Sequence, residues 1–102
     1  MNILRYVGSS AETARTLSQI AELAGVSRRE VEQAVQQARM DGVPLITSER
    51  GVWRAQMPQE ARQMAERLRS RAITQMETAA ALDRAADAME QTGQETLWGR
   101  AA

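Results

Sequence analysis

The chain contains no cysteine and no histidine among its 102 residues. Without cysteine, disulfides, thiolate nucleophiles and Cys-based metal sites are excluded. Without histidine, the commonest general base and the commonest metal ligand are missing too. Paired carboxylates occur on the expected helices, but nothing in the pattern places a nucleophile or a metal beside them. The sequence therefore predicts a protein that is not an enzyme and that holds no metal and no cofactor.

Long apolar runs and lysine are also missing. No hydrophobic run approaches the roughly 20 residues needed to cross a bilayer. Residues 1–7 are too few for the apolar core of a signal peptide, so we expect a cytoplasmic protein without membrane contact. All 13 basic residues are arginine and the formal net charge is zero, which argues against an indiscriminate coat on DNA.

Two capping boxes open two short helices in the first half. The first box is Thr16 with Gln19, and the second is Ser27 with Glu30. Gly25 stands where the first helix must end, because glycine takes the left-handed conformation cheaply. Two short helices joined in this way are typical of a helix-turn-helix. The apolar stripe of the first helix is Leu17, Ile20, Ala21 and Ala24.

The second helix, expected over about residues 28–40, has one apolar and one polar face. Val31, Ala34, Val35 and Ala38 form the apolar face. The polar face is rich in arginine and glutamine, which match guanine and adenine in bidentate geometry; an ordinary solvated face is the alternative. The candidate DNA-binding residues here are Ser27, Arg28, Arg29, Gln33, Gln36 and Gln37.

A hairpin is expected directly after this helix. Gly42 and Pro44 end the helix, and residues 45–54 read as two strands joined by a turn that contains glycine. Arg50 at the tip is a further candidate DNA-binding residue, because narrow minor grooves attract guanidinium groups. Trp53 is expected in the core. Ahead of the first box, residues 3–7 suggest a short helix. For residues 8–15 a loop is preferred, and a helical turn that begins with a capping box of Ser9 and Glu12 is the alternative.

Residues 17–54 resemble the winged-helix domains of bacterial repressors and of the biotin-ligase N-terminal type. Within them, the stretch from Gly42 through Pro44 to Ile46, followed by Arg50-Gly51-Val52-Trp53, is more particular. It is similar to a group of small phage and prophage proteins in which this stretch joins a winged helix to a C-terminal helix; Trp53 stands where tyrosine is usual. The resemblance implies double-stranded DNA binding by Arg28, Arg29, Gln33, Gln36 and Gln37.

The residue pattern of the second half predicts a long helix from Pro58 to about residue 92. We expect this helix to self-associate. Alanine recurs every seven residues, with larger side chains at the complementary position, as in a coiled coil. Basic residues gather in 62–71 and acidic residues in 77–95, which favours an antiparallel pair near Gln75. Folding back onto the first half, and contact of the arginines with DNA phosphates, are the alternatives. The expected oligomerisation residues are Ala65, Leu68, Ala72, Gln75, Met76, Ala79, Leu82, Ala86 and Met89.

Together these patterns predict a mainly α protein with a small β-hairpin wing. Residues 1–57 form a winged helix-turn-helix, 58–92 a coiled-coil-like C-terminal helix, and 93–102 a flexible tail in which Trp98 is either a partner anchor or part of a frayed end. The predicted function is a dimeric, sequence-specific transcription regulator of phage or host origin, with no small-molecule effector. The alternatives are a phage replication, recombination or packaging accessory, and an adaptor or inhibitor that binds proteins rather than DNA.

Overall fold

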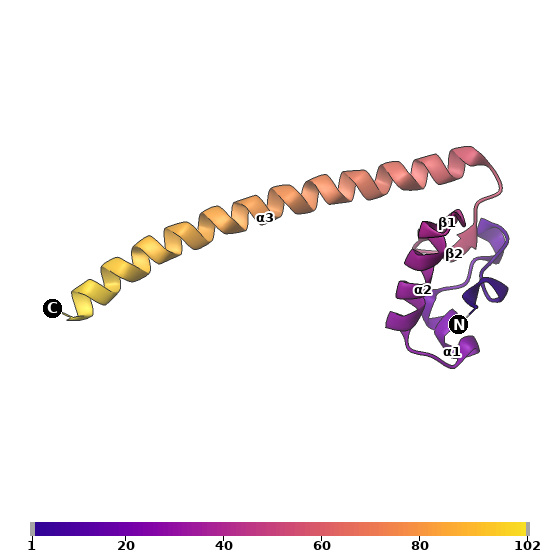
Figure 1. Ribbon diagram of the computed structural model, residues 1–102, viewed down its shortest axis with the longest axis horizontal. Helices are drawn as coiled ribbons and strands as arrows, with labels where there is room; N and C mark the ends of the chain where they lie inside the picture. Colours follow the sequence, from indigo (N-terminus) through magenta and orange to yellow (C-terminus); the bar gives the residue numbers. More distant parts are fainter. Residues whose placement is uncertain (1, 102) are drawn as a thin grey trace. The chain divides into compact units, whose positions relative to one another are not determined.

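The computed structural model describes residues 2–101, and the side chains of residues 2–93. It is mainly helical, with one small two-stranded antiparallel sheet and a long C-terminal helix (Figure 1). Contacts divide the chain into an N-terminal unit, residues 1–66, and a C-terminal unit, residues 67–102. The elements are the 3-10 turns η1 (Ile3–Arg5) and η2 (Ala11–Thr13), the helices α1 (Leu17–Ala24) and α2 (Arg28–Met40), the strands β1 (Leu45–Ser48) and β2 (Gly51–Arg54), and the helix α3 (Pro58–Ala101).

Helices α1 and α2 begin at the two predicted capping boxes. The Thr16 hydroxyl accepts the Gln19 N–H at 3.1 Å, and the Gln19 side-chain oxygen accepts the Thr16 N–H at 2.9 Å. Ser27 and Glu30 make the same reciprocal pair, at 3.1 and 2.8 Å. Gly25 ends α1 with a φ of 70°. These local signals suffice to place both helices, because each satisfies backbone groups that the helix end leaves without partners.

The segment before α1 differs from the prediction. The short helix expected over residues 3–7 is a single 3-10 turn, Ile3–Arg5, whose Ile3 side chain is buried. The loop expected over residues 8–15 contains a second 3-10 turn. There the Thr13 hydroxyl accepts the N–H groups of Ser9 and Ser10, both at 3.1 Å. A side chain that competes for backbone donors favours such a turn over an α-helix.

The predicted hairpin is present, and its second strand is paired on both edges. Strand β1 pairs with β2 from Leu45 opposite Arg54 to Ser48 opposite Gly51. On the outer edge of β2, the Val52 N–H donates to the Arg15 carbonyl at 2.7 Å, and the Arg54 N–H donates to the Gly8 carbonyl at 2.8 Å. The segment just before α1 therefore covers an edge that would otherwise be open to another chain.

Both faces of the hairpin are buried, each by different helices. Leu45 and Val52 pack into the cluster formed with α1, α2 and η1. The next residue on each strand points the other way, and Ile46 and Trp53 pack with Met64 of α3. Trp53 is only 9 % exposed, as predicted for a core residue, and its indole N–H donates to Glu60 Oε2 at 3.3 Å. The first turns of α3 therefore complete the core of the N-terminal unit.

Helix α3 begins at Pro58, the predicted first residue. Proline suits that position because its missing N–H would have no helical partner there. The helix continues to Ala101, past the predicted end near residue 92. The side chains of residues 94–102, including Trp98, lie outside the described residues, so the role predicted for Trp98 stays a prediction. In the described part of the chain, no helix combines the length and the apolar character needed to span a membrane.

Gly51 is the position at which the fold tolerates a side chain least. Its φ is +125°, and a Cβ there would overlap the backbone of Arg15. We expect Gly51→Ala to lower the free energy of unfolding by about 1–3 kcal/mol, because it combines backbone strain with a steric clash. Urea unfolding followed by circular dichroism measures the change.

Gly93→Ala is the matched control. A Cβ at Gly93 would meet no neighbour within 4 Å, and alanine favours helix over glycine by about 1 kcal/mol. Stability equal to or above that of the wild type is expected. A Gly51→Ala protein as stable as Gly93→Ala would contradict the close approach of Gly51 to Arg15.

Candidate nucleic-acid interface

Helix α2 buries one side and presents the predicted DNA-binding side chains on the other. Val31 and Val35 are buried against α1 and the hairpin, as their spacing predicts. All the candidates are exposed, namely Ser27, Arg28, Arg29, Gln33, Gln36, Gln37 and, at the tip of the hairpin, Arg50. The exposed set nevertheless divides into a central line and two flanks, because α2 turns about 100° per residue.

The central line runs opposite the buried valines and carries Arg29, Gln33 and Gln36. Arg28 lies on the flank toward the hairpin. There it lines a hollow together with Ser18, at the start of α1, and Ser48 and Glu49, at the end of β1 and in the turn. This hollow joins the beginnings of both helices to the hairpin tip, so these three parts of the N-terminal unit form one continuous surface.

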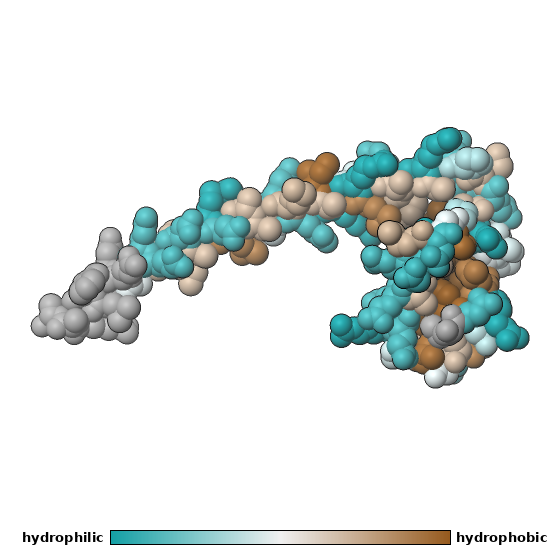
Figure 2. All heavy atoms as spheres, in the orientation of Figure 1, coloured by the Kyte–Doolittle hydropathy of each residue, from teal (hydrophilic) through white to brown (hydrophobic). Residues whose placement is uncertain are grey.

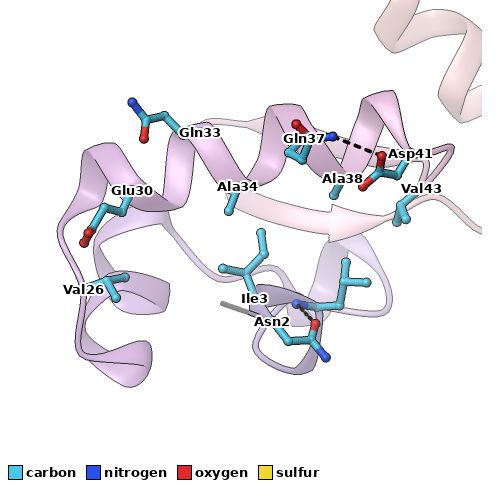
Figure 3. Close-up of a pocket in the computed structure, with 11 residues that line it drawn as sticks. Asn2, Ile3, Val26, Glu30, Gln33, Ala34, Gln37, Ala38, Asp41 and Val43 are labelled. Atoms are coloured by element: carbon cyan, nitrogen blue, oxygen red, sulfur yellow. Dashed lines mark hydrogen bonds between the residues drawn. The ribbon is translucent and has the colours of Figure 1, made fainter.

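The opposite flank borders a groove between α2 and η1 (Figure 3). The groove has a volume of about 570 Å³, and Ile3 and Ala34 are among its apolar lining residues. Gln33 lies at its rim. Gln37 is held there too, since its side-chain amide donates to Asp41 Oδ1 at 3.0 Å. Gln37 therefore lies on the groove side of the central line, on the flank opposite Arg28.

Several candidate side chains already have partners within the fold. Arg28 Nε lies 3.5 Å from Glu32 Oε1, and both side chains are more than half exposed. The Ser27 hydroxyl caps α2. At the hairpin tip, the Arg50 backbone N–H donates to the Ser48 hydroxyl at 3.1 Å. The surface of α2 is close to electrically balanced, because Arg28 and Arg29 are exposed beside two exposed glutamates, Glu30 and Glu32.

The hairpin tip also has an electrostatic neighbour in η2. The pKa of the Glu12 carboxyl is lowered, chiefly by a hydrogen bond from the Glu12 backbone N–H and next by one from the Ser10 hydroxyl. The charge of Arg50 lowers this pKa to a lesser degree. Glu12 is fully exposed. Its carboxylate therefore stays ionised at neutral pH and offsets part of the positive charge of Arg50.

Arg39 is a residue whose role the sequence pattern did not reveal. Its guanidinium is half-buried and donates through Nε to the Leu45 carbonyl at 3.0 Å and through Nη2 to the Thr47 hydroxyl at 3.1 Å. Burial lowers the pKa of this group, which nonetheless remains charged. Arg39 therefore fixes the last turn of α2 against β1 and sets the angle between helix and hairpin. Its spacing from Val35 was the only sequence signal that it faces inward.

No protein-family model, curated protein or solved structure matches this chain. Among the residues whose side chains the structure describes, no cluster of acidic residues is suited to hold a metal ion. A functional assignment therefore depends on the geometry of α2 and the hairpin.

We expect Arg39→Ala to lower the free energy of unfolding by about 1–3 kcal/mol, because it removes two hydrogen bonds from a charged donor and leaves the Leu45 carbonyl without that partner. Arg29→Ala serves as the control, and its effect should stay within about 0.5 kcal/mol because the side chain is exposed. Denaturant unfolding of both proteins measures the difference, and equal stabilities would refute the anchoring role of Arg39.

Proposed function

We propose that the N-terminal unit is a winged helix-turn-helix that binds double-stranded DNA in a sequence-specific manner. The observation that carries the proposal is the hollow in which Arg28, at the start of α2, lies beside the start of α1 and the turn of the hairpin. The exposed central line of α2 begins next to Arg28, at Arg29. The order of elements supports the proposal as well: a strand-like segment at Arg15, then α1, α2 and the hairpin. In this proposal α2 is the recognition helix and the hairpin is the wing.

The chemistry of the central line suits the major groove. Arginine donates two hydrogen bonds to guanine, and glutamine exchanges two with adenine. Arg29 and Gln36 are the residues to which we assign these contacts, with Arg28 beside them toward the wing. Arg50 reaches the adjacent minor groove from the wing tip. Ser27 and the start of α1 lie where a helix-turn-helix contacts the DNA backbone.

Charge balance shapes how such a protein would select its site. Glu32 and Glu49 lie among the candidate cations, so few phosphates are neutralised and non-specific binding is weak. Each neutralised phosphate contributes about −0.9 to the slope of log K against log salt. With Arg28, Arg29 and Arg50 on phosphates or bases, the slope per N-terminal unit is at most about −3. Affinity then depends on base contacts, which suits a transcription regulator with a defined operator.

The groove between α2 and η1 favours a second candidate function, an adaptor that binds another protein. Its apolar lining and polar rim, which includes Glu30 and Asp41, are features of a protein-binding surface, and the zero net charge suits a protein partner. DNA binding and protein binding are separated by the selection experiment that follows.

Selection from random double-stranded DNA at two salt concentrations tests the DNA proposal. The full chain should enrich one motif. In Arg28→Ala/Arg29→Ala, affinity for that motif should fall by about 10–100-fold, since one lost bidentate contact costs about 1–3 kcal/mol. A uniform loss on all sequences would assign these arginines to phosphates instead.

The matched control is Arg67→Ala/Arg84→Ala, which removes the same charge from α3 and should leave the motif and its affinity unchanged. If the wild type enriches no sequence and retains no DNA at low salt, DNA binding is refuted and the adaptor is favoured.

A further inference from the structure

Helix α3 exposes its apolar side chains from Leu68 to Met89. Leu82, Met76 and Met89 are 64 %, 71 % and 73 % exposed, and Figure 2 shows hydrophobic residues between hydrophilic ones along the described part of α3. They are not scattered at random. Leu68, Gln75, Leu82 and Met89 repeat every seven residues and alternate with Ala65, Ala72, Ala79 and Ala86. This stripe, called the seam below, has the spacing of a two-helix contact.

The sizes of the seam residues discriminate between parallel and antiparallel pairing. In a parallel pair each residue meets its own copy, so narrow Ala72–Ala72 layers would alternate with wide Leu82–Leu82 layers. The distance between two helix axes depends on the side chains at the contact, between about 8 and 10 Å. One spacing cannot suit both kinds of layer without leaving voids, which are costly.

We propose that the seam pairs with a second copy of this chain in antiparallel orientation, with Gln75 opposite Ala79 at the centre. Ala72 then lies opposite Leu82 of the second copy, and Leu68 opposite Ala86. Every layer combines one alanine with one larger side chain, so a single close spacing serves the whole contact. Gln75 supplies the polar layer that fixes the register.

The residues beside the seam provide independent support through charge complementarity. Next to the large seam positions stand Arg62, Arg69, Met76, Asp83 and Glu90, again seven residues apart. In the proposed register Arg69 faces Asp83 of the second copy, Arg62 faces Glu90, and Met76 faces its own counterpart. Each of these two charge contacts occurs twice in the symmetric pair, and all four are attractive. Parallel pairing would place Arg71 beside Met76 and Asp83 beside Thr78, without any opposite-charge pair.

The same residues exclude neighbouring registers. A shift of one heptad in either direction leaves Met76 opposite a charged side chain, Arg69 or Asp83. Such a shift also leaves one kind of opposite-charge contact in the pair, where the proposed register has two. The proposed register is the one that matches charge with charge and apolar with apolar along the whole flank.

The seam becomes available to a partner beyond the first turns of α3. Met64 is buried against the hairpin, and Ala61 and Ala65 are half-buried, whereas the side chains from Glu66 to Gly93 are exposed. The main contact therefore extends from Leu68 to Ala86. None of its residues lies on α2 or the hairpin, so the pairing stands or falls independently of DNA binding.

Charge reversal of each half of the flank tests the proposal in the full chain. Sedimentation equilibrium should give twice the 11.3 kDa chain mass for the wild type. Arg62→Glu/Arg69→Glu and Asp83→Arg/Glu90→Arg should each raise the dissociation constant of the dimer by about tenfold or more, because four attractive contacts become repulsive. Mixed in equal amounts, the two variants should form a heterodimer, since every contact is then attractive again.

Arg67→Glu/Arg84→Glu is the matched control, because it changes the net charge as much as Arg62→Glu/Arg69→Glu but lies on the outer side of the helix. It should leave the dissociation constant unchanged. A monomeric wild type at high concentration would overturn the proposal, and so would a dimer whose affinity both reversals leave intact. Circular dichroism verifies that each variant stays helical.

The orientation has a separate test, made simple by the absence of native cysteine. Under oxidising conditions Ala72→Cys mixed with Leu82→Cys should form a mixed disulfide, because these positions face each other only in the antiparallel register. Ala72→Cys alone should not cross-link, and Ala81→Cys, on the outer side, serves as a negative control. Efficient cross-linking of Ala72→Cys to itself would show a parallel pair and refute the proposed arrangement.

Discussion

The backbone of Val52 is the point on which the N-terminal unit depends. Its N–H donates to the Arg15 carbonyl, and its own carbonyl accepts the N–H groups of both Gly8 and Arg15 at 3.3 Å. Its side chain is 1 % exposed in the core. One residue therefore connects the chain start, the entrance to α1 and the hairpin. A unit of this size has little core to spare, so such shared contacts matter more than they would in a larger domain.

The two-sided burial of the hairpin extends this constraint to α3. Alternation along a strand sends Leu45 and Ile46 to opposite faces, and each face requires its own cover. The helices α1 and α2 supply one, and Met64 supplies the other. The start of α3 is thereby part of the core, whereas the apolar side chains from Leu68 to Met89 lie in solvent. A single helix thus serves two purposes, and the change occurs between Met64 and Leu68.

Local features of this fold could be predicted from the sequence, and tertiary ones could not. The capping boxes at Thr16 and Ser27, the hairpin and the burial of Trp53 all follow from signals within a few residues. The short helix expected over residues 3–7 is a single 3-10 turn, and the sequence favours a loop where the Thr13 hydroxyl stabilises a second one. The role of Arg39 depends on how α2 lies on β1, which no local pattern encodes. For the candidate interface, periodicity identified the exposed face of α2. Only the structure separates the central line from the Gln37 flank, which the groove and Asp41 define.

The exposed methionines give the seam a chemical sensitivity that its geometry alone does not suggest. Met89 belongs to the seam and Met76 stands beside it, and both are well exposed. In a chain without cysteine, thioethers are the side chains most readily attacked by peroxide. Conversion to the sulfoxide makes an apolar side chain polar. Oxidative damage would therefore reach the C-terminal helix before it reached Met64, which the hairpin shields, and the proposed self-association would respond to oxidants earlier than folding.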